Sequence, residues 1–81
     1  MVVMPRYYFN IYHDGPDLDD EGLDLPDHDA AREDAVAFTS DMLKVLGEQF
    51  KPGDEWRLEV ADETKAVLFV IRVQGEAVKA S

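Results

Sequence analysis

Residues 55–73, EWRLEVADETKAVLFVIRV, decide the fold. Their first part alternates between apolar and charged side chains, which is the period of a strand with one buried face. A polar turn at residues 62–65 follows, and residues 66–73 form a nearly continuous apolar strand. The stretch predicts an antiparallel hairpin. The side chains expected on its buried face are Trp56, Leu58, Val60, Val67, Phe69, Ile71 and Val73.

The residues near the start of the chain predict two further strands. Residues 6–13, RYYFNIYH, alternate and are rich in aromatic side chains, so they predict a strand. Residues 14–16, DGP, break this strand. Residues 22–26, GLDLP, predict a short second strand, and the acidic loop between the two strands is short enough for a loose hairpin.

One amphipathic helix is expected between the two strand pairs. Asp27 is a suitable N-cap, and a KPG sequence at residues 51–53 stops the helix, which therefore runs from about residue 28 to residues 47–50. Apolar residues recur at helical spacing and predict a stripe that packs on the sheet. The stripe contains Ala31, Ala35, Phe38, Met42, Val45 and Leu46, and Val36, Leu43 and Phe50 widen it.

The element order β-β-α-β-β predicts the α+β class, with a four-stranded antiparallel sheet and one helix. The 81 residues are enough for a single domain over residues 1–81. We expect an extension at residues 1–3, with Met4 as an alternative start, and a tail at residues 76–81, both frayed.

The sheet face away from the helix should be polar, because one helix covers only one face. Half of the side chains expected there are apolar, which is typical of an association surface, although scattered surface apolar residues are also ordinary. We therefore predict a symmetric homodimer formed through this face or through a sheet edge. The interface residues predicted on this face are Tyr8, Tyr12, Leu68 and Val70. The predicted core contains Phe9, Phe38, Trp56, Phe69 and Ile71.

The formal net charge is −10, and nearly all of it lies in one segment. Residues 14–34 contain ten acidic residues and one basic residue, whereas the rest of the chain is almost balanced. Such a field repels nucleic acid and anionic membranes and attracts cations or basic protein surfaces. We therefore expect no nucleic-acid or membrane partner, and an acidic decoy for a basic protein is the alternative to a simple solvated loop.

A calcium site is a second reading of the acidic segment. Asp17, Asp19, Glu21 and the glycine that follows imitate the first half of an EF-hand loop. The imitation fails at the last ligand position, where His28 replaces the bidentate glutamate. The predicted contacts for a cation or a basic partner are Asp17, Asp19, Asp20 and Glu21.

No motif in the sequence points to catalysis or to a cofactor. Two histidines without cysteine make a poor zinc set, and no nucleophile stands beside a base at a recognisable spacing. We therefore expect a non-enzymatic protein without metal or cofactor. The absence of cysteine, of a long apolar run and of a secretion-signal pattern at the start leads us to expect a cytoplasmic protein.

The chain resembles a family of short proteobacterial proteins of unknown function. The pattern is an MPRYFF-like start, D-G, D-x-x-G-x-x-L-P, an acidic Ala-rich helix and W-x-L-x-V-x-D-E. The matching residues are Met4, Pro5, Arg6, Tyr7, Phe9, Asp14, Gly15, Asp19, Gly22, Leu25, Pro26, Trp56, Leu58, Val60, Asp62 and Glu63. The resemblance implies a complete, soluble bacterial domain and carries over no activity or catalytic residue.

Overall fold

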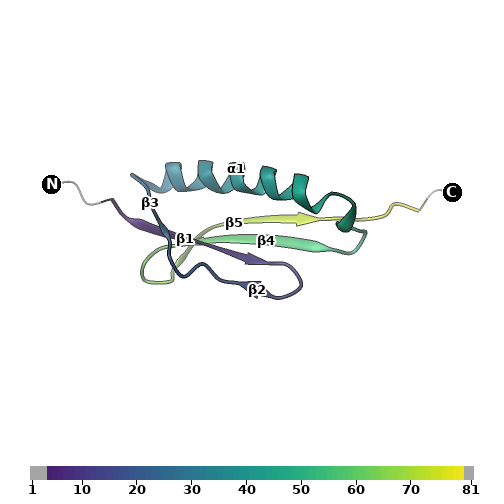
Figure 1. The fold of residues 1–81 in the computed structure, drawn as a ribbon, viewed down its shortest axis with the longest axis horizontal. Coiled ribbons are helices and arrows are strands. Elements are labelled where there is room, and N and C mark those ends of the chain that lie inside the picture. The colour runs from purple at the N-terminus through teal and green to yellow at the C-terminus, as the bar shows by residue number, and fades with distance from the viewer. Residues whose placement is uncertain (1–3, 80–81) are drawn as a thin grey trace.

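The computed structural model describes residues 4–79, so the expected extension at residues 1–3 lies outside the described residues. The elements are β1 (Arg6–Tyr12), β2 (Pro16–Asp17), β3 (Leu23–Asp24), α1 (His28–Leu46), a 3-10 turn η1 (Gly47–Gln49), β4 (Glu55–Ala61) and β5 (Val67–Gln74) (Figure 1). This confirms the α+β class. Residues 76–79 of the expected tail are exposed and have no regular secondary structure.

The sheet is antiparallel, and its strand order is β2-β1-β4-β5. Strands β2 and β3 both pair with β1, at opposite ends, so together they form one interrupted strand along its outer edge. Residues 18–22 bulge out between them. The sheet is therefore four strands wide, as predicted, although β2 begins at Pro16, inside the segment expected to be a break.

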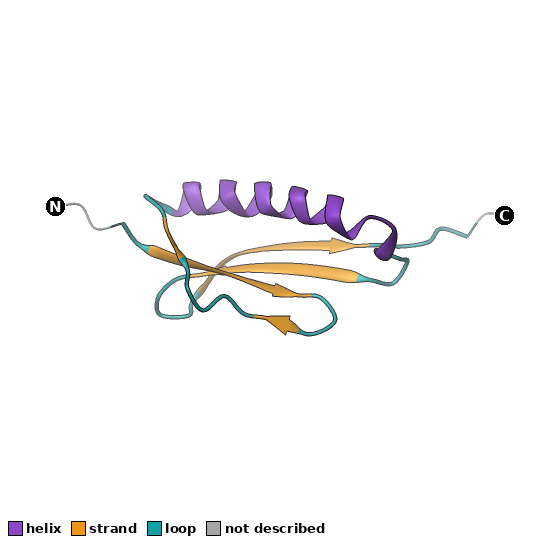
Figure 2. Cartoon of the chain, in the orientation of Figure 1, coloured by secondary structure: helices purple, strands orange, loops and turns teal. Residues whose placement is uncertain are grey.

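Helix α1 covers one face of the sheet and begins and ends as its sequence indicates (Figure 2). The Asp27 side chain accepts a hydrogen bond from the Ala30 N–H at 2.8 Å, which caps the first turn. At the other end Gly47 has a φ of 42°, and its N–H donates to the Leu43 carbonyl. The single turn η1 then leads into the connection to β4.

The core lies between α1 and the sheet, and α1 packs over β4 and β5 rather than over the middle of the sheet. The buried apolar residues of this layer are Tyr7, Ala31, Ala35, Leu46, Trp56, Leu58 and Val60. Of the predicted core residues, Trp56 is fully buried, and Phe9, Phe69 and Ile71 are partly buried. Phe38 is also a predicted core residue, but the residue is 37% exposed. The centre of its ring lies 6.5 Å from the centre of the Trp56 ring.

A β-bulge in the hairpin of β4 and β5 changes the position of Leu68, one of the predicted interface residues. Strict alternation placed Leu68 on the open face with Val70. Val60 of β4 pairs with Phe69 of β5, but the next residue, Ala61, pairs with Val67. Leu68 is therefore an extra residue without a partner in β4. Its side chain lines a hollow with the first turns of α1. The bulge therefore breaks the strict alternation that placed Leu68 beside Val70, and the role of Leu68 in an interface stays a prediction.

Candidate interaction surfaces

The acidic loop is organised by Asp19, which fills the gap between β2 and β3. Its carboxylate accepts hydrogen bonds from the N–H groups of Phe9, Glu21 and Gly22, and its own N–H donates to the Asn10 side chain. Partial burial would raise the pKa of Asp19, but the three N–H groups outweigh it, so the pKa lies below its ordinary value. The carboxylate is committed to holding the edge strand together.

The other predicted acidic contacts lie on the same loop but do not form a cation site. Asp17, Asp20 and Glu21 are exposed, and the Glu21 carbonyl accepts a hydrogen bond from Arg6 Nη1 at 3.1 Å. Within residues 4–79 no group of three or more acidic or histidine side chains converges as a metal site would require. Asp17, Asp19 and Asp20 instead line one side of an open groove.

Arg6 fastens β3 to the start of β1. Its Nε lies 2.9 Å from Asp24 Oδ1, and the hydrogen bond from Arg6 lowers the pKa of Asp24. The Arg6 stem passes so close to Gly22 that a Cβ there would lie 2.7 Å from the Arg6 Cγ. Gly22 also has a φ of +76°, so only glycine fits this position without strain.

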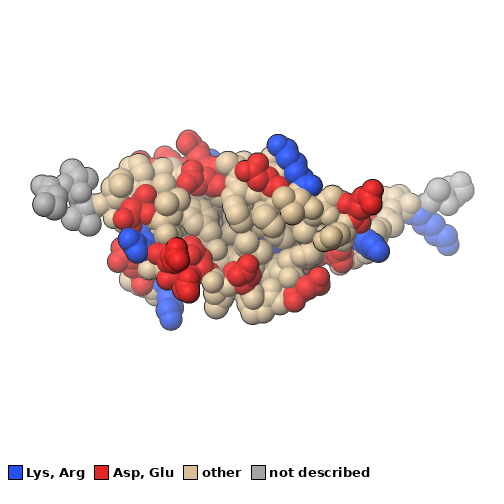
Figure 3. Space-filling view, in the orientation of Figure 1, with Lys and Arg blue, Asp and Glu red and all other residues tan. Residues whose placement is uncertain are grey.

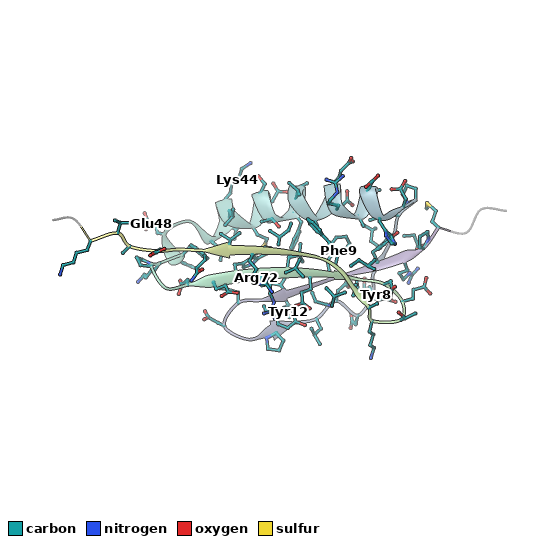
Figure 4. The ribbon with its side chains drawn as sticks, turned by 180° about the vertical axis from the view of Figure 1, so that it is seen from behind. Tyr8, Phe9, Tyr12, Lys44, Glu48 and Arg72 are labelled. Carbon is teal, nitrogen blue, oxygen red and sulfur yellow. The ribbon has the colours of Figure 1, made fainter. Side chains whose placement is uncertain are left out.

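The sheet face away from α1 carries three of the four predicted interface residues, Tyr8, Tyr12 and Val70. Figure 4 shows Tyr8 and Tyr12 on the side of the sheet opposite to Phe9, which points toward the helix. The Arg57 guanidinium lies 4.3 Å from the centre of the Tyr12 ring. Tyr8, Tyr12 and Val70 are half-buried.

Arg57 is held on this face by charge rather than by a hydrogen bond. Its Nε lies 3.1 Å from Glu59 Oε2, but the two groups are not aligned for hydrogen bonding, so the contact is an ion pair. The open face is therefore a partly self-covered mixture of aromatic and charged groups.

The outer edge of β5 is the second surface. Within residues 4–79 no strand pairs with this edge, whereas the outer edge of β1 is covered by β2 and β3. The eight residues of β5 contain no proline and one charge, Arg72. Apart from the bulge at Leu68, β5 therefore lacks the proline and the repeated charges that protect edge strands from pairing. Figure 4 shows the molecule from behind, with β5 running across the front of the sheet.

Exposed apolar side chains of α1 flank this edge. Steps of about 100° per residue from the buried Ala35 place Val36 and Leu43 on the β5 side of the helix and Phe38 on the β1 side. Val36 is 53% exposed and Leu43 is 38% exposed. The helical spacing places both residues at the margin of the apolar stripe but predicts no function for them. The reason is that the spacing of apolar residues does not show where a helix lies across a sheet.

The third surface is a groove of about 450 Å³ between α1 and the loop that joins β2 to β3. It exists because α1 lies toward β5 and leaves part of the inward face of β1 uncovered. We call it the acidic groove. Its lining residues are Phe9, Ile11, Asp17, Leu18, Asp19, Asp20, Leu23, Asp34 and Phe38. Figure 3 shows this side of the molecule, where acidic side chains flank a hollow formed by uncharged atoms below the helix.

No helix within residues 4–79 has the length and apolar character needed to cross a membrane. Residues 6–74 match the family described as "Domain of unknown function (DUF6894)", and the match runs from the start of β1 to the end of β5. Neither a curated protein nor a solved structure matches the chain. The match includes all three surfaces and confirms the expected membership of a family of unknown function. The chain thus belongs to the DUF6894 family.

Proposed function

We propose that this protein is a small non-enzymatic interaction domain that forms a homodimer through the outer edge of β5. The observation that carries the proposal is the unpaired edge of a long apolar strand, next to exposed apolar residues of α1. An unpaired edge offers a row of free backbone groups to another strand. A second copy of β5 has the matching row, and a two-fold axis would place the two rows side by side.

The backbone of β5 is set up for such pairing. The Phe9 N–H points away from β4, toward Asp19, and the Gly75 N–H bonds to the Asp54 carbonyl. In an antiparallel ladder, hydrogen-bonded and non-hydrogen-bonded residue pairs alternate. Both the Phe9 and the Gly75 N–H directions therefore predict that Phe69, Ile71 and Val73 bond to β4. The remaining residues, Val70, Arg72 and Gln74, direct their N–H and C=O groups outward.

The position of α1 also fits a continuous sheet through β5. Neighbouring strands lie about 4.8 Å apart, and α1 lies over both β4 and β5. A β5–β5 pair therefore puts the two helix axes about 10 Å apart, which is close to the usual 8–10 Å of packed helices. Val36 and Leu43 would then lose their exposure to solvent, and the bulged Leu68 would lie near the same seam.

Charge favours this edge over the other edge of the sheet. The acidic residues 14–24 lie beyond β1, on the far side of the sheet from β5. Arg32 is on the β5 side of α1, where it lines a hollow with Leu68. Two copies that meet at β5 therefore keep their acidic loops apart, which limits their mutual repulsion.

The test is a proline at an outward-facing position of β5. Arg72→Pro removes an outward N–H that pairs with no strand within residues 4–79, so the monomer should stay folded while the dimer dissociates. Arg72→Thr is the matched control, because it changes the same side chain but keeps the N–H. Light scattering should give twice the monomer mass for the wild-type protein and for Arg72→Thr, and the monomer mass for Arg72→Pro.

A second pair of variants keeps the test decisive if proline disturbs the fold. Leu43→Glu places a charge at the predicted helix seam, whereas Val45→Glu places it on the opposite flank of α1. We expect at least about tenfold weaker pairing for Leu43→Glu and no change for Val45→Glu. A wild-type protein that stays monomeric at the highest soluble concentration contradicts the proposal, as does equal pairing of both glutamate variants.

The predicted role of Tyr8 and Tyr12 in pairing is not part of this edge-to-edge arrangement. Both stay a prediction for the open face, and a dimer that survives Arg72→Pro but not Tyr12→Ser would support that face instead. Bacterial origin and a cytoplasmic location complete the proposal, supported by the family resemblance and by the absence of cysteine.

Ordinary structural roles of the perturbed carboxylates support the absence of enzymatic activity. The pKa values of Asp24 and Asp62 are lowered by hydrogen bonds from Arg6 and from the Thr64 hydroxyl. Both carboxylates hold turns or strands in place, as Asp19 does. Carboxylates prepared for acid or base catalysis have pKa values moved toward neutrality, in the opposite direction.

A further inference from the structure

We infer that the acidic groove binds a basic segment of a partner protein, one that presents large apolar side chains between lysine or arginine residues. The inference does not depend on the proposed dimer, because the groove lies on the β1 side of α1 and the dimer edge lies on the β5 side. It rests on two properties of the same hollow, an apolar interior and an acidic rim.

The interior of the groove is apolar and open to solvent. Phe9 and Ile11 of β1 contribute to it, with Phe38 from the helix and Leu18 and Leu23 from the other side. Leu18 is 60% exposed and Leu23 is 46% exposed, so they offer apolar surface that the folded monomer does not use. A volume of about 450 Å³ is within the usual range for sites that take large side chains or small ligands.

The rim has one sign of charge. Asp17 and Asp20 come from the loop side and Asp34 from the helix side. Among residues 4–79, the lining contains no lysine, arginine or histidine. Asp19 is also in the lining, but its carboxylate is occupied by backbone N–H groups. The rim carboxylates lie on opposite sides of an apolar floor. They therefore favour a ligand in which a large apolar side chain has a cationic side chain on each side of it.

This charge selects among the occupants of the groove. Nucleic acid and anionic lipid are repelled by the aspartates. The second copy of the proposed dimer lies on the β5 side of α1, and a further copy offers few cationic groups to this rim, because the chain has 8 lysine and arginine residues against 18 acidic ones. The carboxylates do not converge as metal ligands within residues 4–79. A basic, partly apolar polypeptide segment satisfies both the floor and the rim.

The experiment is selection of short random peptides displayed on phage against the full-length protein. We expect the enriched peptides to combine lysine or arginine with leucine, phenylalanine or tryptophan. Binding of one enriched peptide, labelled with fluorescein, is then measured by fluorescence anisotropy. Amide NMR should show its largest shifts at residues 9, 11, 18, 23 and 38.

Two matched pairs of variants locate the site. Leu18→Ala removes an apolar contact in the groove, and Val45→Ala makes a similar change at an exposed residue of α1 that is outside the groove lining. Asp34→Asn removes one charge from the rim, and Glu33→Gln removes the same charge from the neighbouring residue, which points away. Each groove variant should weaken peptide binding by about fivefold or more, and each control should leave it unchanged.

Three results would overturn the inference: enriched peptides that are neutral or acidic, amide shifts outside the groove, or equal effects of groove and control variants. Shifts of groove amides on dilution without peptide would show that a second copy occupies the groove, and this too would overturn it. The Arg72→Pro variant should bind the peptide as the wild-type protein does. Failure of the dimer and failure of the groove can therefore be distinguished.

Discussion

Asp19 shows how one residue of a very acidic loop can have a structural role. Its carboxylate accepts the hydrogen bond of the Phe9 N–H, a group of β1 that neither β2 nor β3 pairs with, and its own N–H bonds to Asn10. The neighbouring Asp20 has the same chemistry and is exposed. The sequence assigned both residues to one group of possible partner contacts, because a charge run does not reveal which carboxylate faces the backbone.

Asp19→Ala should therefore lower the free energy of unfolding by about 1–2 kcal/mol, since it leaves three N–H groups without their acceptor. Asp20→Ala is the matched control and should change stability by less than about 0.5 kcal/mol. Urea denaturation followed by tryptophan fluorescence, with Trp56 as the probe, measures both variants. Equal effects of the two substitutions would mean that the carboxylate of Asp19 does not hold the edge strand.

The stabilisation by Asp19 should also depend on pH. Its pKa in the folded protein lies below the ordinary value of 3.8, so the folded state binds this proton less readily than the unfolded state does. The contribution is complete above pH 3.8 and is lost as the pH falls through the lower, folded value. The difference in stability between wild type and Asp19→Ala should shrink over that range, and a difference that grows in acid would contradict this account.

At the scale of elements, the N-terminal cap of α1 is the clearest local prediction. Asp27→Ala removes the acceptor of the Ala30 N–H and should lower the free energy of unfolding by about 1 kcal/mol. Asp29→Ala is the control, because Asp29 lies in the first turn but makes only an exposed ion pair with Arg32. Thermal unfolding followed by circular dichroism should show the larger loss for Asp27→Ala.

The regular parts of the fold could be predicted from the sequence. Trp56, Leu58 and Val60 alternate over a whole strand, and the stripe of α1 has a clear period, so both elements and the α+β class follow from their spacing. Strand β2 has two residues, too few to show any period. The bulge beside Leu68 could not be seen either, because a nearly continuous apolar run gives the same pattern with or without an extra residue.

The surfaces were harder to predict than the elements. The sequence identifies the loop around Asp17 as acidic and the segment around Val70 as an apolar strand. The sequence does not show that α1 lies toward β5. This position of the helix opens the acidic groove beside Phe38, and it also brings Val36 and Leu43 to the edge of the sheet. Such sideways placement is set by how all the core side chains fit together, which no local spacing records.

For the whole molecule, the net charge of −10 predicts opposite effects of salt on the two proposed contacts. Raising the ionic strength from about 0.01 M to about 0.1 M shortens the screening length from about 30 Å to about 10 Å. Pairing of two acidic copies should then become tighter, whereas binding of a basic peptide in the acidic groove should become weaker. Sedimentation and fluorescence anisotropy in the same buffers measure the two trends, and a shared direction would contradict one of the two proposals.

The interrupted strand formed by β2 and β3 has a consequence for how far assembly can proceed. A sheet that can be extended on both sides can add copies without limit, as filaments do. Here the border beyond β1 consists of two strands of two residues each, separated by an acidic loop, so an incoming chain finds no continuous strand to pair with. In the proposed pairing, growth from β5 would therefore stop once two copies have met, because residues 18–22 interrupt the strand at the other border of the sheet.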